Sequence, residues 1–140
     1  MKVIFLDVDG VLVHDKTVGL GRTEPHGSSF RHAAQVDPDA AKRLLRICEV
    51  TGARIVVCSV WRKFDSHMGG LERALATTMG VASRRAVREL FAGAPPVRAD
   101  ENRAEEIADW LAMHKSVVDV THYVVIDDGP IVGHPQAEPL

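Results

Sequence analysis

Three short runs of apolar, largely β-branched residues occur along the chain, at Lys2 to Leu6, Arg54 to Cys58 and His122 to Ile126. Each run has the length of a strand, and its apolar character is continuous instead of alternating with polar positions. Continuous apolar runs of this length are typical of strands that are covered on both faces of a parallel sheet. The pattern therefore predicts three buried strands of a parallel sheet.

Between these runs, the apolar positions recur at helical spacing. The clearest helix starts at Asp37, which can cap the first turn, with Pro38 in the first helical position and Gly52 at the end. Shorter helices are expected over 69–79 and 83–91, and a further helix over 100–114 with Asp100 as its cap. Strands that alternate with helices build a parallel sheet covered on both faces, so we expect a three-layer α/β/α, Rossmann-like fold.

Two segments show neither pattern. Residues 13–36 are polar and contain several glycines. A plain loop of this length is unusual, so we expect a small hairpin or flap there, beside the functional site. Residues 133–140 are expected to form a tail, because they contain a glycine and two prolines. The 140 residues have the length of a single domain.

The composition excludes several classes of protein. Apolar residues make up 46% and charged residues 26%, which is ordinary for a globular protein. A formal net charge of -2 argues against a broad nucleic-acid surface. The two cysteines lie in apolar runs and are expected to be reduced core residues, and the seven histidines lack metal-binding spacing. No apolar stretch could span a membrane and no signal-peptide pattern is present, so the expected location is the cytoplasm.

Polar residues follow directly after each predicted strand. In parallel α/β sheets, ligands bind beyond the carboxyl ends of the strands, so these residues are expected to share one edge. They are Asp7, Asp9 and Gly10 after the first strand, Ser59, Trp61 and Arg62 after the second, and Asp127 and Asp128 after the third. Four carboxylates at one edge would repel one another, and a hard cation that prefers oxygen ligands, such as Mg²⁺, removes that problem.

The spacing of Asp7 and Asp9 adds a second indication. Side chains two residues apart on a strand lie on one face, so these two could flank one reacting group, one attacking it and the other moving protons. Gly10 would let the chain leave the strand tightly and let backbone amides approach a phosphate. Alone, this segment could be an ordinary turn. The pair Asp127 and Asp128 after another strand makes a functional site the better interpretation.

Three segments together resemble the motifs of the haloacid dehalogenase-like (HAD) superfamily of phosphatases. Residues 7–11 (DVDGV) are similar to the first motif, 56–59 (VVCS) to the second and 124–128 (VVIDD) to the fourth, in the expected order. Residues 59–62 and 103–111 further resemble a small group of HAD domains associated with RNA-repair proteins. The resemblance implies a HAD-like fold. The short segments between the motifs leave room only for a minimal cap, and the C-terminus, 12 residues after Asp128, is shorter than the family pattern.

The resemblance also implies a role for each residue. Asp7 would be the nucleophile that forms an aspartyl-phosphate, and Asp9 would protonate the leaving oxygen and then activate water. Ser59 would hydrogen-bond a phosphate oxygen, and the backbone amides at Gly10 would approach the same phosphate. Mg²⁺ would be held by Asp7, the Asp9 backbone carbonyl and Asp127, with Asp128 supporting the metal site.

The third HAD motif is a Lys or Arg that stabilises the nucleophile, and here Arg98, Arg103 and Lys115 are the candidates. Lys115 is expected at the end of its helix that faces away from the site. Arg103 lies in the first turn, near the correct edge, and is favoured over Arg98 in spite of the small cost of a cation at a helix N-terminus. Arg62 could contact a substrate phosphate while Trp61 stacks on a base. Alternatively, Trp61 packs under the flap and Arg62 is solvated.

The sequence thus predicts a Mg²⁺-dependent phosphomonoesterase with an open site, because 13–36 is too short for a large cap domain. The expected substrate is a phosphorylated small molecule or a nucleic-acid end. A catalytically silent HAD-fold binding or regulatory module is the alternative. A receiver-type phospho-acceptor domain is disfavoured, because the middle strand ends in Cys58 and Ser59 instead of an acceptor aspartate. No membrane partner is expected, and an exposed sheet edge leaves a homodimer open.

Overall fold

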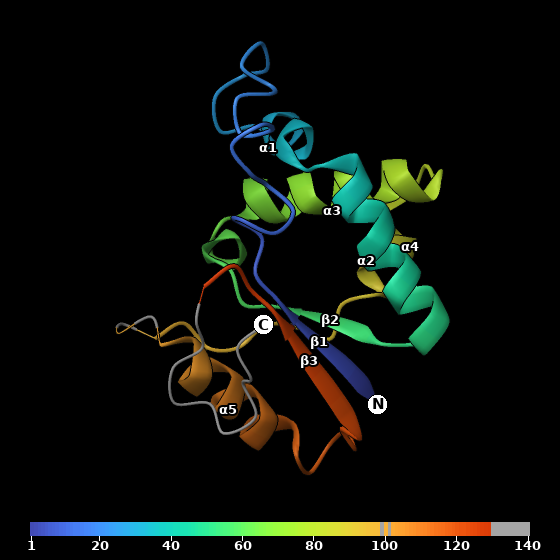
Figure 1. Ribbon diagram of the computed structural model, residues 1–140, viewed down its shortest axis with the longest axis vertical. Helices are drawn as coiled ribbons and strands as arrows, with labels where there is room; N and C mark the ends of the chain where they lie inside the picture. Colours follow the sequence, from blue (N-terminus) through green and yellow to red (C-terminus); the bar gives the residue numbers. More distant parts are fainter. Residues whose placement is uncertain (99, 101, 130–140) are drawn as a thin grey trace.

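The computed structural model describes residues 1–98, 100 and 102–129 of the chain (Figure 1). The elements in chain order are β1 Lys2–Leu6, α1 Ser29–Gln35, α2 Pro38–Thr51, β2 Arg54–Val57, the 3-10 helix η1 Val60–Lys63, α3 Asp65–Met79, α4 Arg84–Arg88, α5 Arg103–His114 and β3 His122–Ile126. None of the described helices is long and apolar enough to cross a membrane.

The sheet has three parallel strands, with β1 in the centre between β2 and β3. Ile4 of β1 pairs with Ile55 of β2 on one side and with Val124 of β3 on the other. From Val3 onward β1 is buried, as its continuous apolar sequence predicts for a central strand. The predicted parallel sheet is confirmed.

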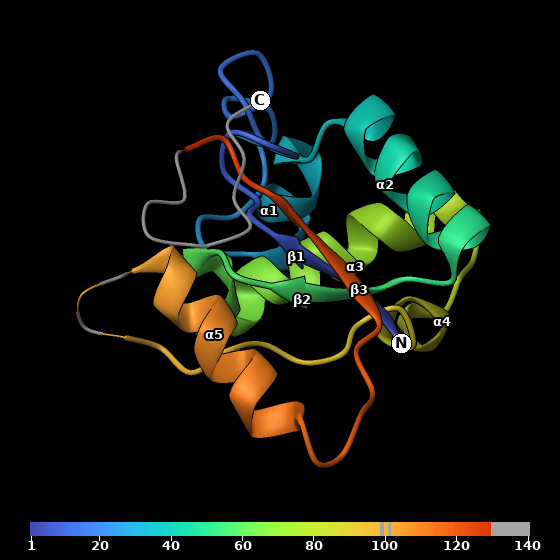
Figure 2. The ribbon, with the colours of Figure 1, turned by 60° about the horizontal axis from the view of Figure 1, so that its bottom comes forward.

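Helices cover both faces of this sheet. Ile4 and Leu6 of β1 pack into the larger core, which α2 and α3 close. Phe5 points to the opposite face, as the alternation of side chains along a strand requires, and meets Trp110 of α5 edge to face at 5.5 Å. In Figure 1, α2 and α3 lie above the sheet and α5 lies below it, and the rotated view in Figure 2 keeps α5 apart from them. The predicted Rossmann-like α/β fold is confirmed.

The helix boundaries follow the capping residues. The Asp37 side chain accepts a hydrogen bond from the backbone of Asp39 at 2.9 Å, Pro38 opens α2, and Gly52 ends it with φ 71°. These are the predicted positions. The cap of α5 is Asn102, not Asp100, because the Asn102 side chain accepts from the backbone of Glu105 at 3.1 Å. Two other bounds also differ from the expectation, since α3 begins at residue 65 and α4 covers only 84–88.

The segment 13–36 forms turns and the helix α1 and contains no hairpin, so of the two expected forms, hairpin or flap, the hairpin is not observed. Ser28 caps this helix by accepting a hydrogen bond from the backbone of Arg31 at 3.2 Å. The helix packs on α3 at Gly70, where an added Cβ would lie only 2.5 Å from the Cβ of His32. Tight packing of α1 on α3 therefore depends on a glycine whose importance the hydrophobic pattern does not show.

The two outer strands differ in how their edges are covered. Beyond β2, Ile55 donates its backbone N–H to Leu90 at 2.7 Å and accepts from Ala92 at 2.8 Å, which adds a short parallel bridge at Phe91. β3 is only partly buried, and Val124 is 52% exposed. The expectation of a fully buried third strand is therefore wrong, because β3 is an edge strand of the described sheet. The expected tail over 133–140 lies outside the described residues.

Candidate active site

The carboxyl ends of the three strands meet at one edge of the sheet. Leu6 pairs with Val57 and with Ile126, so the residues that follow these positions leave the sheet side by side. The backbone N–H of Asp7 donates to Ile126 at 2.9 Å. The first and fourth motif segments are therefore fixed to each other by the main chain at this edge.

Three carboxylates gather where β1 and β3 end. Asp7, Asp127 and Asp128 each offer an oxygen atom, and these oxygens all lie within 4.8 Å of one another. A donor set of carboxylate oxygens without sulfur or imidazole is the chemistry that suits Mg²⁺ or another hard cation. The residues present therefore fit the predicted cation.

The raised pKa of Asp7 agrees with a cluster whose negative charges are not fully balanced by nearby positive charge. Burial is the main cause that raises the pKa of Asp7 from 3.8 to about 7, and the negative charge of Asp127 and a hydrogen bond with Asp128 act in the same direction. Arg103 lowers the pKa of Asp7 but does not offset these effects. A divalent cation would supply the missing positive charge, so the electrostatics agree with the donor chemistry.

Gly10 makes the approach of Asp128 possible. Its φ is +82°, a conformation that side chains with a Cβ rarely adopt. A Cβ built on this residue would lie 2.0 Å from Oδ2 of Asp128. The turn after the first motif thus leaves space that a carboxylate of the fourth motif fills.

Arg103, in the first turn of α5, reaches this carboxylate cluster. Its Nε donates to Oδ2 of Asp127 at 2.9 Å, and one of its terminal nitrogens lies 3.6 Å from Oδ1 of Asp7. Arg98 instead forms ion pairs with Asp100, Glu105 and Asp109. Lys115 follows the last residue of α5, at the opposite end from Arg103. Of the three candidate cations, Arg103 is the one that contacts Asp7.

Ser59 and Asp9 are both hydrogen-bonded to Trp61, Ser59 to its backbone N–H and Asp9 to its indole N–H. Ser59 lies just after β2, and its Oγ accepts a hydrogen bond from the backbone N–H of Trp61 at 3.2 Å. The Nε1–H of Trp61 donates to Oδ1 of Asp9 at 3.0 Å. Trp61 is 3% exposed. Its indole is thus too buried to stack on a substrate base, and it instead orients the second aspartate of the first motif.

The family model described as "HAD domain in Swiss Army Knife RNA repair proteins" matches residues 3–139. The chain belongs to this HAD family. No curated protein and no solved structure matches the chain. HAD domains are typically hydrolases, and phosphatases in particular, so the family agrees with a phosphohydrolase-type role.

In this HAD domain, Arg62 faces the interior. It donates to the backbone carbonyls of Cys58 at 2.7 Å and Ser59 at 2.9 Å, and it pairs with Oε1 of Glu106 at 2.8 Å. Only 6% of its side chain is exposed. Neither expected state of Arg62, solvated or turned toward a substrate phosphate, agrees with these contacts. Arg62 fixes the loop after β2 instead.

Glu106 is the site residue that the sequence pattern did not reveal. It is buried, and it accepts from Arg62 through one oxygen and from Arg103, at 3.0 Å, through the other. It therefore joins the loop after β2 to the arginine that contacts Asp7 and Asp127. Glu106 lies three residues after Arg103 and therefore on the same helix face. This spacing is the feature of the sequence that could have identified it as a partner of Arg103.

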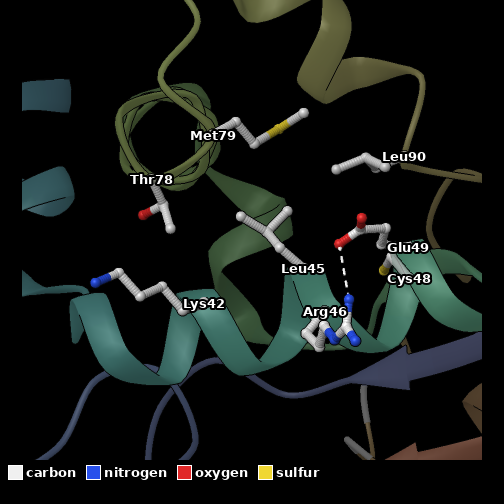
Figure 3. A pocket seen from close by; sticks show the side chains of 8 residues that line it. All are labelled: Lys42, Leu45, Arg46, Cys48, Glu49, Thr78, Met79 and Leu90. Atoms are coloured by element: carbon white, nitrogen blue, oxygen red, sulfur yellow. Dashed lines mark ion pairs between the residues drawn. The ribbon is translucent and has the colours of Figure 1, made fainter.

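A groove of about 430 Å³ lies elsewhere, between α2 and the end of α3 (Figure 3). Leu45 and Met79 contribute apolar side chains to it, and Arg46 forms an ion pair with Glu49 at 3.5 Å beside them. Its lining includes none of the predicted site residues. The groove is therefore separate from the carboxylate cluster.

Proposed function

We propose that this HAD domain is a Mg²⁺-dependent phosphomonoesterase that acts through a phosphorylated Asp7. The observation that carries the proposal is the group of three carboxylates, Asp7, Asp127 and Asp128, with Arg103 in contact with two of them. Opposite charges held close together in a partly buried position are suited to binding a phosphoryl group and a cation.

The proposed reaction has two displacement steps. In the first, an Asp7 carboxylate oxygen attacks phosphorus, the bond from phosphorus to the ester oxygen breaks, and Asp9 gives its proton to that leaving oxygen. In the second, Asp9 takes a proton from water as the water oxygen attacks phosphorus. The bond to Asp7 then breaks, which releases inorganic phosphate and restores both carboxyl groups.

The surrounding residues support these two aspartates. Asp7, Asp127 and Asp128 would hold the cation, together with the Asp9 backbone carbonyl. Bound Mg²⁺ would reduce the repulsion between the anionic nucleophile and the anionic phosphate. Arg103 adds a fixed positive charge next to Asp7, and Trp61 keeps one oxygen of Asp9 in a hydrogen bond. Ser59 is the proposed donor to a phosphate oxygen.

The proposed substrate class is the phosphate at the end of a nucleic acid, with phosphorylated small molecules as the other option. Three observations favour it. The matching family model describes HAD domains of RNA-repair proteins. The segment 13–36 adds only turns and α1 above the sheet, so it does not build a domain that could enclose a small substrate. Asp9 is exposed, as a group that meets a large substrate must be.

Phosphate release from 3′- and 5′-phosphorylated oligonucleotides and from a small phosphate ester, with and without Mg²⁺, tests the proposal. We expect Mg²⁺-dependent release, and Asp7→Asn should reduce kcat by about 10⁴-fold or more, because removing a nucleophile leaves only the residual effect of binding and electrostatics. Asp119→Asn is the matched control, since Asp119 is exposed in the loop before β3, at the opposite edge of the sheet.

Three outcomes would contradict the proposal. Release that does not need Mg²⁺ would remove the cation from the mechanism, and equal release by the Asp7→Asn variant would remove the covalent step. Binding of the oligonucleotide without any release would identify the chain as the silent binding module.

A further inference from the structure

A half-exposed aromatic residue lies next to the candidate active site. Phe64 follows η1 and precedes α3, and it is 50% exposed. Its ring packs on His67 of α3, with 5.0 Å between the ring centroids and an angle of 39° between the planes. Phe64 therefore presents aromatic surface to solvent while a second ring supports it.

This aromatic pair is connected to the catalytic residues through two further rings. His67 stacks on His32 at 3.6 Å, and both imidazoles meet the indole of Trp61 edge to face, at 5.2 and 5.5 Å. Trp61 in turn donates to Asp9. Phe64 and Asp9 thus belong to one continuous group of packed side chains, with Phe64 at its exposed end.

The position of this group in the fold agrees with that connection. η1 and the start of α3 follow directly after β2, whose carboxyl end lies beside that of β1. The residues that follow β2 thus lie beside Asp7, within reach of a molecule whose phosphate is bound there. Phe64 is the exposed aromatic side chain on that segment.

The chemistry of the pair favours an uncharged planar ring as its ligand. Partial burial, and then the nearby His32, lower the pKa of His67 below its ordinary value in spite of the opposing charge of Asp9, which favours the neutral form of the imidazole behind Phe64. The exposed half of the Phe64 ring is available for base stacking, which tolerates any base because every base has a π-face. The net charge of -2 argues against long contact with a phosphate backbone, so one terminal base is the fitting occupant.

We propose that Phe64, supported by His67, is the stacking platform for the terminal base of a phosphorylated nucleic-acid end. This inference rests on the proposed function and specifies where that substrate is recognised. It assigns base stacking to Phe64 instead of to the buried Trp61. Trp61 and Phe64 then have separate tasks, because one orients Asp9 and the other binds the part of the substrate that does not react.

A pair of substrates that differ only in the terminal base tests this platform. Both are single-stranded oligoribonucleotides with the same terminal phosphate, and one has an abasic terminal residue. We expect the intact substrate to have a kcat/KM about five- to hundredfold higher, the range that stacking of one base provides. The difference should appear in KM, because the base binds equally in the ground and transition states.

Substitutions at Phe64 should change that preference. Phe64→Leu keeps the apolar bulk but removes the ring, and we expect the kcat/KM ratio of the two substrates to fall close to one. Phe64→Trp should keep or increase the ratio. Phe30→Ala is the matched control: Phe30 is also half exposed, at 55%, but it lies on α1 with Arg73 over its ring at 4.2 Å. This variant should keep the wild-type ratio.

Binding measurements separate the failure of the platform from the failure of the proposed function. Fluorescence anisotropy of both oligonucleotides, labelled at the far end, is measured with Asp7→Asn, alone and combined with Phe64→Leu. If the wild type releases no phosphate, the proposed function fails, and tighter binding of the intact oligonucleotide that requires Phe64 would still support the platform. Equal affinity for the two oligonucleotides, or an equal loss of preference in Phe30→Ala, would overturn it.

Discussion

The two sides of the candidate active site differ in the interactions that hold them together. On the side of β3 and α5, arginine and carboxylate groups are in direct contact, with Arg103 between Asp7, Asp127 and Glu106. On the side of η1 and α3, aromatic rings pack on one another, and a single hydrogen bond from Trp61 reaches Asp9. We call these the ionic side and the aromatic side.

This difference shows how two aspartates two residues apart can acquire different tasks. Asp7 lies on the ionic side, where a cation and Arg103 can stabilise the charge that develops on a transferring phosphoryl group. Asp9 lies on the aromatic side, where no arginine forms an ion pair with it among the described residues. The ionic side is thus suited to the chemistry at phosphorus, and the aromatic side is suited to the leaving group.

The largest effect that would sharpen this comparison is expected at Arg103. Arg103→Lys keeps the positive charge but cannot reach Asp7, Asp127 and Glu106 together, because an ammonium group lacks the planar fork of a guanidinium. We expect kcat to fall about 10²- to 10³-fold, the range for loss of one preorganised stabilising group. Steady-state phosphate release gives the value.

The matched control for this change is Arg98→Lys. Arg98 precedes the same helix and also pairs with three carboxylates, but these are Asp100, Glu105 and Asp109, away from Asp7. Its kcat should stay at the wild-type level. An equal loss of kcat in both variants would mean that Arg103 acts only through the stability of α5. The contacts of the ionic side would then not contribute to catalysis.

A smaller effect is expected on the aromatic side. Trp61→Phe keeps a ring against both His32 and His67 but removes the N–H that holds Asp9. We expect kcat to fall about tenfold, since Asp9 keeps its chemistry but loses part of its orientation, and general acid–base catalysis contributes about 10²- to 10⁴-fold in total.

A double-mutant cycle with Asp9→Asn checks that Trp61 acts through Asp9. In the Asp9→Asn background, Trp61→Phe should cause little further loss of kcat, because the two residues are coupled. Independent, multiplicative losses would show that the indole contributes to packing and not to the position of the acid–base group.

The smallest effect is expected on the thermal stability of the protein without Mg²⁺, through Asp7 on the ionic side. Because the folded-state pKa of Asp7 is raised to about 7 from 3.8, its contribution to stability is full below about pH 4 and is lost as the pH rises through 7. Asp7→Asn removes this titration. Without Mg²⁺, the variant should therefore melt a few degrees above the wild type at pH 8 and by a smaller margin at pH 5.

Addition of Mg²⁺ provides the complementary test. A cation that binds the folded state stabilises it by mass action and competes with the proton on Asp7, so Mg²⁺ should raise the wild-type Tm more at pH 8 than at pH 5. Differential scanning fluorimetry records both series. A Tm difference between variant and wild type that does not change with pH would show that Asp7 is not the carboxylate whose pKa is raised.

Much of the fold was predictable from the sequence because the signals were local and strong. The three apolar runs form strands, and the cap residues of α2 lie where Asp37, Pro38 and Gly52 predict them. The grouping of Asp7 with Asp127 followed from one general rule, that parallel strands present their carboxyl ends at the same edge. These features depend on chain neighbours and sheet topology, which are both visible in a sequence.

The remaining features depend on contacts that a pattern does not contain. Asp100 and Asn102 have similar capping ability, so the start of α5 depends on packing and not on residue type. The inward direction of Arg62 depends on its buried partner Glu106, 44 residues later in the chain. The helix α1 needed the close approach of His32 to Gly70 on α3. Such long-range pairs become apparent only in three dimensions.

The contact between Gly10 and Asp128 makes residue 10 a practical marker for sorting related sequences. A Cβ there would lie 2.0 Å from Oδ2 of Asp128, so any other residue must displace that carboxylate. A relative that keeps both aspartates of the first motif but has alanine at this position is expected to bind the cation poorly. Such a sequence would be grouped with binding modules and not with hydrolases, although a search for the aspartates alone would count it as an enzyme.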